Sequence, residues 1–333
     1  MGQYNKALGE YQVSLRLSPD DVVNYSNLGL TYLSLGRLDE AKATFDQAVA
    51  RKLDSESLHE DLYLFAFLRG DQAQMAEQVA RGMSDPEDGL STQSDTDAYH
   101  GRLHNARVLS RRAVESAIRT ESKESAALWQ VNAALREAEV GNTAFARQGV
   151  AAALALSQER FVKSVAALTL ARVGDASGAT ALAKELQKSF PTNTLLNFYW
   201  LPTINAEIEL RHENSSKAIV LLEPATPYEL SMGGNESLLY AGYPAYVRGQ
   251  AYLLAHNGTA AAAEFQKLLD HPGIMLNFET GALAHLQIGR AYFVAGDSAK
   301  AKTAYEDFFN LWKDADPDIP VLKDAKAEYA RIQ

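Results

Sequence analysis

Small and apolar residues recur along this chain in stripes of three, at positions i, i+4 and i+7. The clearest stripes begin at Ala41, Ala261 and Ala301, and each contains a large aromatic residue. Residues with this spacing lie on one face of an α-helix, so each stripe predicts an amphipathic helix. Weaker stripes with the same spacing begin at Ala7, Met75, Ala106, Ala146, Ala179 and Ala218. The pattern therefore predicts helices along the whole chain.

The stripes return with a period of one helical hairpin. Their first residues lie 31 to 43 residues apart, which fits a hairpin with small insertions in several units. A glycine stands about five residues before most stripes, where it can end one helix in a left-handed conformation and let the chain reverse. These glycines are Gly2, Gly36, Gly70, Gly101, Gly141, Gly174 and Gly296. We therefore expect a series of helix–turn–helix units.

The helix before each glycine has a motif of its own. Residues 25–32 read YSNLGLTY and residues 285–292 read HLQIGRAY, and Gly249 precedes Tyr252 with the same spacing. In this motif the glycine lets two helices approach closely and the tyrosine fills the remaining space.

These residues resemble the tetratricopeptide repeat family along essentially the whole chain. The resemblance is strong at 22–55 and 282–315, moderate at 127–191 and 242–275, and weak at 56–83, 88–120 and 195–225. It implies an all-α fold, a right-handed α-α superhelix (TPR-like solenoid) of about eight helical hairpins plus a C-terminal capping helix. Such arrays bind a protein or peptide ligand on the concave groove lined by the first helix of each hairpin.

We expect one array over residues 1–333. Its expected parts are the second helix of a truncated repeat at 1–18, repeats at 22–83, an irregular repeat with a loop at 84–120, repeats at 123–191, a divergent repeat at 193–225, a loop at 226–241, repeats at 242–315 with an insertion at 270–281, and a capping helix at 319–333. The most loop-like stretches, 84–96 and 224–244, are either tolerated insertions or a binding edge.

A narrower resemblance concerns four segments of the chain. They lie at 48–59, 195–204, 265–277 and 311–330. They are similar to the repeat region that follows the kinase domain in acidobacterial serine/threonine protein kinases, which implies a role in sensing or recruiting partners. The chain contains no GxGxxG loop, VAIK lysine, HRD or DFG segment, so no residue is assigned to phosphotransfer.

Composition narrows the classes of partner. The chain has 42 acidic and 32 basic residues and a net charge of −10, which opposes binding to nucleic acid. It has no cysteine, which excludes a disulfide scaffold and a thiolate metal site. No apolar run approaches the ~18 residues of a membrane span. We therefore expect no transmembrane segment and a soluble chain, either cytoplasmic or an extracytoplasmic region of a membrane-anchored parent.

Two clusters have the spacing of metal ligands, and neither predicts a metal site. His100 and His104 are separated by Gly101 at a predicted turn, and the sequence places no third ligand beside them. Asp314, Asp316 and Asp318 alternate like the first ligands of a calcium loop, but the glycine and glutamate that such a loop requires are absent. We expect no metal, no cofactor and no catalytic residue.

Two surfaces are candidates for partner binding. Consecutive first helices carry aromatic and arginine residues, the types enriched at interface hot spots. This candidate partner-binding groove consists of Trp200, Glu207, Arg211, Tyr243, Tyr246, Gln250 and Arg290. The alternative is that its aromatic residues pack between hairpins. A candidate basic patch consists of Arg102, Arg107, Arg111 and Arg112. It suits an acidic partner or an anionic membrane surface, or it is a solvated helix face.

The favoured function is a non-catalytic protein-interaction or sensory module of a larger bacterial signalling protein, specifically the C-terminal region of a serine/threonine protein kinase. The alternatives are a stand-alone scaffold that assembles an envelope or secretion complex, and the repeat region of a transcriptional regulator. An enzyme with its own active site is disfavoured because the chain lacks the residues for one.

Overall fold

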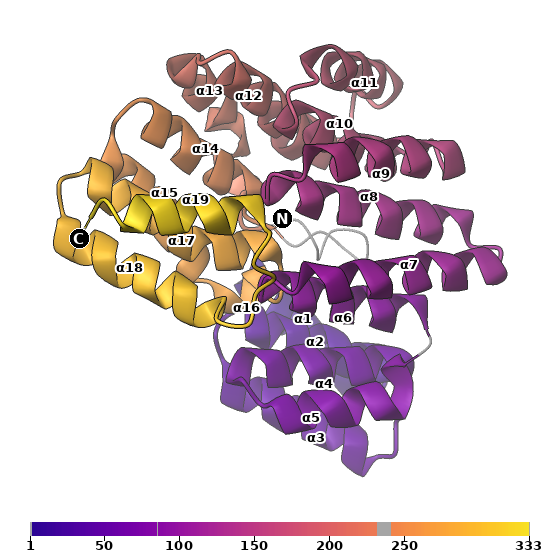
Figure 1. Cartoon of the computed structure of the whole chain (residues 1–333). Coiled ribbons are helices and arrows are strands. Elements are labelled where there is room, and N and C mark those ends of the chain that lie inside the picture. Colours follow the sequence, from indigo (N-terminus) through magenta and orange to yellow (C-terminus); the bar gives the residue numbers. More distant parts are fainter. Residues whose placement is uncertain (1, 85, 232–240, 333) are drawn as a thin grey trace.

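The computed structural model describes residues 2–84, 86–231 and 241–332 (Figure 1). Within these ranges the regular structure is helical and no β-strand occurs. The chain begins with α1 (Tyr4–Leu17), continues through eight helical hairpins and ends with α19 (Pro320–Tyr329). The hairpins are α2–α3 (Val22–Ser34, Leu38–Ala50), α4–α5 (Glu56–Arg69, Gln72–Gln78), α6–α7 (Glu87–Tyr99, Leu103–Arg119), α8–α9 (Lys123–Glu139, Thr143–Leu156), α10–α11 (Arg160–Arg172, Ala176–Ser189), α12–α13 (Leu201–Arg211, Ser215–Leu222), α14–α15 (Tyr243–Leu254, Gly258–Leu269) and α17–α18 (Glu279–Val294, Ser298–Leu311).

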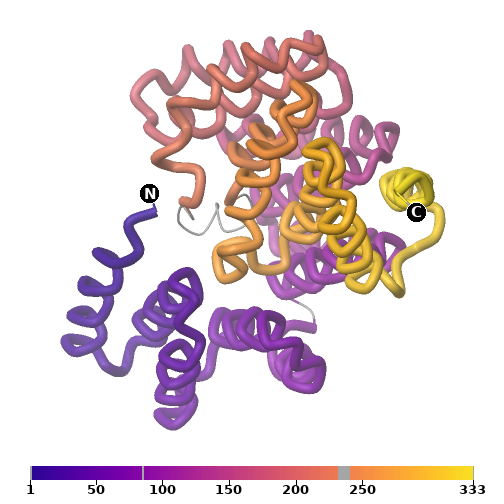
Figure 2. The backbone as a smooth tube through the Cα atoms, turned by 90° about the vertical axis from the view of Figure 1, so that its left-hand side faces the viewer, coloured from indigo at the N-terminus to yellow at the C-terminus, as the bar shows by residue number. Residues whose placement is uncertain are grey.

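The hairpins stack into a right-handed α-α superhelix, which confirms the predicted fold class. Figure 2 shows the backbone curving from the N-terminal hairpins through the middle of the chain and back towards its start. Short helical pieces interrupt the hairpins. They are the π-helices η1 (Val79–Met83) and η2 (Leu196–Trp200), the 3-10 helix η3 (Glu223–Tyr228) and the one-turn helix α16 (Pro272–Met275).

The predicted use of glycine at close helix contacts is confirmed. A Cβ added to Gly29 would lie 2.2 Å from the ring of Phe45, and one added to Gly249 would lie 2.6 Å from the ring of Phe265. Both rings are fully buried. The glycines that end the first helices also take the predicted left-handed conformation, as Gly70 does with φ 67°. At these two contacts an aromatic ring of one helix fits against a glycine of its partner helix.

The expectation of a loop at 84–96 is wrong, because α6 begins at Glu87. This helix has no apolar stripe, since it is buried through polar pairs. The Ser94 hydroxyl donates to the backbone carbonyl of Ala106 over 2.7 Å, and Asp95 accepts from the Asn132 amide over 3.0 Å. Ser94 and Asp95 are both buried. Polar residues that are satisfied inside a core leave no hydrophobic period to detect.

The second expected loop is described only in part. Its first residues form η3, which ends at Tyr228, and α14 begins at Tyr243. Residues 232–240 lie outside the described ranges. The expected loop at 226–241 therefore begins before regular structure ends at Tyr228, and its central part lies outside the described residues.

The last hairpins return to the first ones, so the superhelix closes on itself. Helix α17 packs against α6 and α8, and α16 packs against α2. The Trp312 indole donates to the Tyr99 carbonyl over 2.9 Å, and the Val321 amide donates to the Val140 carbonyl over 3.2 Å. The concave side of the array is therefore covered largely by its own helices.

No helix in the described ranges is both long and apolar enough to cross a membrane.

Candidate functional site

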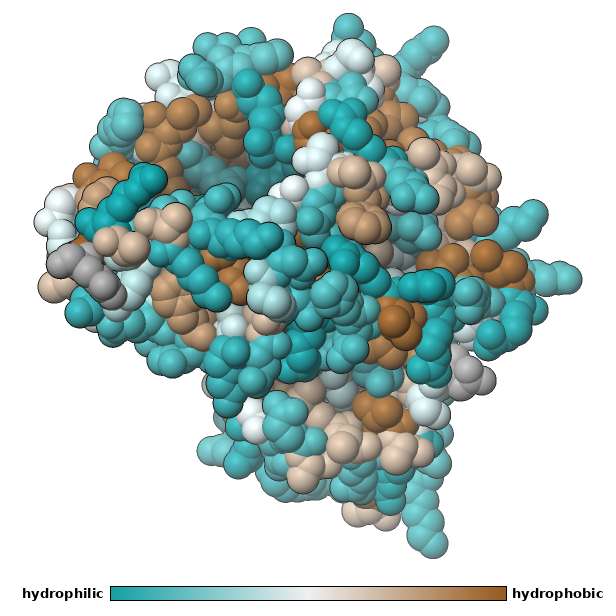
Figure 3. Space-filling view, in the orientation of Figure 1, coloured by the Kyte–Doolittle hydropathy of each residue, from teal (hydrophilic) through white to brown (hydrophobic). Residues whose placement is uncertain are grey.

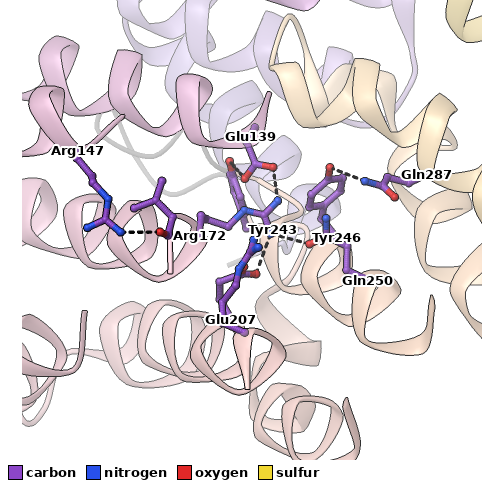
Figure 4. A network of polar contacts seen from close by, with 10 residues as sticks. Glu139, Arg147, Arg172, Glu207, Tyr243, Tyr246, Gln250 and Gln287 are labelled. Carbon is purple, nitrogen blue, oxygen red and sulfur yellow. Dashed lines mark hydrogen bonds and ion pairs between the residues drawn. The ribbon is translucent and has the colours of Figure 1, made fainter. Parts of the chain in front are cut away.

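A buried polar cluster lies where α8, α10, α12 and α14 meet, and we call it the inner network (Figure 4). The Arg172 guanidinium is at its centre. It donates to Glu207 over 2.8 Å and to the Gln250 side chain over 2.6 Å, and it forms an ion pair with Glu139. The Tyr243 hydroxyl donates to Glu139 over 3.1 Å. These five residues define the inner network.

In the inner network the positive charge of Arg172 lies between two buried carboxylates. Burial lowers the pKa of Arg172, but the charges of Glu139 and Glu207 outweigh burial and hold its pKa well above the ordinary value. Burial raises the pKa of Glu139, while the charge of Arg172 opposes that rise. Since Arg172 already binds both carboxylates, it is not available to bind an anionic ligand. The network holds four helices together.

The candidate groove residues with aromatic rings lie in the interior. Trp200 is 3% exposed and packs edge-on against Phe161, with 5.5 Å between ring centroids. Tyr243 and Tyr246 are 0% and 1% exposed. Tyr246 accepts a hydrogen bond from Gln287 over 3.3 Å. The expectation that these three rings face an open groove is wrong, because they pack against side chains of their own and neighbouring hairpins, such as Phe265 beside Tyr246.

The charged groove candidates lie closer to solvent. The Arg211 side chain is 46% exposed and contacts Glu207, which is buried, over 2.8 Å. Gln250 is half-buried on the same network. Arg290 is separate from this group, since it forms a bidentate pair with Glu328 of α19 at 2.8 and 2.9 Å. The structure therefore brings Glu207, Arg211 and Gln250 together but not Arg290.

Figure 3 shows a hollow with hydrophilic side chains at the upper left of the face seen in Figure 1. It lies between α12, α14 and α19, and α12 and α14 also supply Arg211 and Gln250. We call Arg211 and Gln250 the rim of the inner network.

The sequence reasoning missed Glu139 and Arg172, although both carry the network. A signal was present, because each is the last residue of a first helix, shortly before the glycine that ends the hairpin's first half. At these two places the charged side chain faces inward, whereas Arg69 and Arg211 at the ends of α4 and α12 are exposed. The signal is therefore the opposite charge at the same place in two consecutive hairpins.

Two of the four arginines in the candidate basic patch are paired with carboxylates. Arg102 pairs with Asp97 over 2.7 Å, and Arg107 pairs with Glu137 over 2.6 Å. Arg112 is exposed and donates to the backbone carbonyl of Ser84 over 2.9 Å. Arg111 is exposed and makes no ion pair with any described residue. Arg111 and Arg112 therefore keep their positive charge without a carboxylate partner among the described residues.

Arg107 and Arg111 line a surface groove of about 540 Å³ between α7 and α9, with α8 as its floor. We call this the α7–α9 groove. Its floor contains Ala133 and Ala134, whose small side chains leave room above α8. Phe145 on α9 is 54% exposed and lies under the Arg107 guanidinium, 4.6 Å from the ring centroid. The groove is therefore apolar in its centre and charged at its edges.

The histidine cluster and the aspartate cluster, which have the spacing of metal ligands, contact each other through His104 and Asp316. Asp316 accepts the backbone N–H of His104 over 2.7 Å, at the start of α7, and also faces the His104 ring over 3.0 Å. Burial lowers the pKa of His100. No group of three or more metal-ligating side chains occurs within the described residues. The acidic turn therefore joins the end of the array to α7.

Tetratricopeptide repeat families match the chain at residues 1–62 and at residues 283–314. These matches include the two segments in which the repeat motif is clearest. The chain thus carries tetratricopeptide repeats near both of its ends. No curated protein matches the chain in sequence.

Solved structures share the fold at low sequence identity. A monomeric mutant of IFIT1 with Gppp-AAAA is 14% identical, with a TM-score of 0.52, and the match covers 94% of this chain and 74% of that one. The human IFIT1 dimer with PPP-AAAA is 18% identical, with a TM-score of 0.48 and coverage of 99% and 78%. Yeast Tom70 is 13% identical, with a TM-score of 0.45 and coverage of 99% and 85%.

Proposed function

We propose that this chain is a non-catalytic protein-interaction module and that it binds a helical segment of a partner protein in the α7–α9 groove. The observation that supports this choice is the contrast between the two faces of the array. The concave face is covered by the chain's own helices, whereas the α7–α9 groove is open and carries an exposed Phe145 and an unpaired Arg111. Aromatic and arginine side chains dominate the binding energy of protein interfaces.

The shape of the groove suits a short amphipathic helix. The lining residues of α7 run from Arg107 to Glu115, a rise of about 12 Å or roughly two helical turns. A partner helix would place apolar residues at i, i+4 and i+7 over Ala133 and Ala134 and an acidic residue opposite Arg111. Arg107 and Glu137 neutralise each other, so Arg111 supplies the charge that selects an acidic residue.

The test uses partner capture with matched variants. Partners crosslinked to the parent chain are identified, and their affinity is measured for Phe145→Ala and Arg111→Glu. We expect each variant to weaken binding by about 1–3 kcal/mol without a change in thermal unfolding. Val220→Ala is the control, because Val220 is equally exposed, at 58%, on the distant helix α13. Equal affinity of all three variants would reject the groove as the binding surface.

The rim of the inner network is a second candidate contact surface. Arg211 lies at the end of α12, one of the helices that border the hollow of Figure 3, and its side chain is 46% exposed. In the same capture experiment, Arg211→Ala should weaken only a partner that enters the hollow. Loss of binding with Arg211→Ala but not with Phe145→Ala would move the site to the rim.

We further propose that the module belongs to a bacterial serine/threonine kinase as its C-terminal region. The segments at 48–59, 195–204, 265–277 and 311–330, which resemble such regions, support this. A kinase domain encoded upstream in the same reading frame would support the assignment, and a signal peptide there would favour an envelope or secretion scaffold instead. The purified chain should show no magnesium-dependent ATP hydrolysis, because it lacks the nucleotide motifs.

A further inference from the structure

The segment that joins α15 to α17 is buried although it lies between two hairpins. We call residues 271–278 the latch. From Gly273 to Phe278 every side chain of the latch is buried, and α16 is its only helical turn. Connections between hairpins ordinarily run over the surface, because buried backbone groups need partners. A buried connection of this length indicates that it occupies a surface belonging to other hairpins.

The latch inserts side chains into separate hydrophobic clusters. Met275 packs with the C-terminal hairpins, and Phe278 packs with the middle hairpins near Tyr243. Leu276 packs with the N-terminal hairpins, against a cluster that includes Leu64 and Met75. Three side chains within four residues thus reach three parts of the array.

The latch fits closely against the N-terminal side of the array. Gly273 lies on the end of α2, so near that an added Cβ would be 1.8 Å from the carbonyl oxygen of Leu33. The Asn277 amide donates to the carbonyl of Thr92 over 2.8 Å and to the hydroxyl of Thr96 over 2.9 Å, both on α6. The contacts with the N-terminal side therefore come from three residues of the latch that lie within five positions: a glycine, an apolar anchor and a carboxamide.

Two features make this docking costly. Leu276 has φ 48° and ψ −135°, a backbone conformation that is strained for any residue with a Cβ. Glu279, which directly follows the latch, is 1% exposed, and neither of its carboxylate oxygens has a hydrogen-bond partner. Closure thus holds a strained leucine beside an unpaired carboxyl group in the interior, and the strain of Leu276 is released when the latch leaves.

We propose that the latch is an internal pseudo-ligand that occupies a peptide-binding surface formed by α2, α4 and α6, and that a partner segment of the same chemistry binds there when the latch lifts. The partner's chemistry follows from the contacts of the latch. It is a segment whose small residue lies in a single helical turn, with an apolar anchor three positions later and a carboxamide directly after the anchor. A partner without the strain of Leu276 gains the same contacts at lower cost.

Besides the latch, the N-terminal hairpins meet the rest of the array at α6 and near Leu230. The Tyr4 hydroxyl donates to the Leu230 carbonyl over 2.6 Å. Helix α4 and the π-helix η1 pack against α6, and the Phe67 ring packs edge-on against Tyr99 with 5.0 Å between ring centroids. A π-helix is a common place for a backbone to bend at functional sites. Lifting the latch requires the α2–α16 contact to open and Leu276 to leave its cluster.

The proposal rests on the chain being an interaction module, but it does not depend on the α7–α9 groove. Its test needs only the chain and a labelled synthetic peptide of residues 271–279, so it can fail while the groove assignment holds. Peptide binding is measured by fluorescence anisotropy for the parent, for Gly273→Ala and for Gly9→Ala. Gly9→Ala is the matched control, because an added Cβ at Gly9 meets no atom within 4 Å.

We expect Gly273→Ala to displace the latch from Leu33 and to bind the peptide at least 10-fold more tightly than the parent or the control. A peptide that carries Leu276→Asp should not bind. Equal binding by Gly273→Ala and the parent would overturn the proposal. So would loss of the folded state in Gly273→Ala, since a latch whose release unfolds the chain is part of the core.

A second measurement uses the absence of cysteine in the chain. Leu276→Cys and Leu168→Cys each introduce a single buried thiol, the second within the core of α10. We expect a thiol reagent to modify the thiol of the Leu276→Cys variant at least 10-fold faster than the thiol of the Leu168→Cys variant. The peptide should increase the rate for Leu276→Cys further, because it competes with the latch. Equal protection of the two thiols, unchanged by the peptide, would show that the latch is a permanent part of the core and overturn the proposal.

Discussion

The ring of Phe265 fills the space that a side chain at Gly249 would need, with 2.6 Å between the ring and the position of an added Cβ. Each hairpin of the clear repeats uses such a contact. We expect Gly249→Ala to lower the free energy of unfolding by about 1–3 kcal/mol, because overpacking forces the buried ring to shift. Urea denaturation measures the change. Gly9→Ala, with no neighbour, should leave stability equal or slightly higher, and equal stability of both variants would contradict this packing argument.

Replacing Arg172 should be far more damaging than replacing an exposed arginine. Arg172→Met leaves Glu139 and Glu207 buried without their cation, so we expect a loss of about 3–5 kcal/mol. Arg37 forms an exposed pair with Glu40 over 2.6 Å, and Arg37→Met should cost about 0–1 kcal/mol. Chemical denaturation of both variants checks the comparison. A small loss with Arg172→Met would mean that the inner network does not hold the four helices together.

Stability should fall as pH rises from the acidic to the neutral range. Burial raises the pKa of Asp61 and of Glu279 to about 8 each. Between about pH 4 and about pH 8 the unfolded chain has released these protons while the folded chain still holds them, so the free energy of unfolding falls as pH rises through this range. Above about pH 8 the groups are ionised in both states, and the fall ends.

The neutral variants isolate this effect. Asp61→Asn and Glu279→Gln should each flatten the pH dependence between about pH 5 and 8, by up to about 1.4 kcal/mol per pH unit. Thermal unfolding at several pH values measures the slopes. Asp46→Asn is the control, since the Asp46 side chain is 62% exposed. Parallel slopes for the parent and both buried variants would show that these carboxyl groups are ionised in the folded chain.

Helix α1 should be the least protected helix in hydrogen exchange. None of its residues is buried, whereas α17 packs against helices on several sides. Protection against exchange follows the free energy of local opening, which is small where few apolar contacts hold a helix. Mass spectrometry of peptides from residues 4–17 and 279–294 makes the comparison. Equal protection of the two segments would contradict it.

The hairpins could be predicted because each one buries a periodic apolar face against its own partner. The stripe that begins at Ala261 and the turn glycine Gly70 are local signals of this kind. Helix α6 escaped detection, since Ser94 and Asp95 are buried through hydrogen bonds rather than through apolar contact. The same physical reason hid the inner network, in which charged groups stabilise one another inside the protein.

The candidate aromatic residues were misplaced for a different reason. Tyr243 and Tyr246 lie on the concave face of their helix, as the repeat pattern indicates. Whether that face is open depends on contacts such as the one between Asn277 and Thr92, which are 185 residues apart. Closure of this kind has no short-range signature. The sequence therefore predicts which face turns inward but not that the chain fills the space in front of it.

The bond from Trp312 to Tyr99 spans 213 residues and has a consequence for how the chain folds. An open array gains stability repeat by repeat and can fray from its ends. Here the last helices are completed only when they reach hairpins near the start of the chain, which raises the contact order and slows folding. The last helices and the third hairpin therefore unfold together. During synthesis the third hairpin cannot form its final contacts until almost all of the remaining chain has been made.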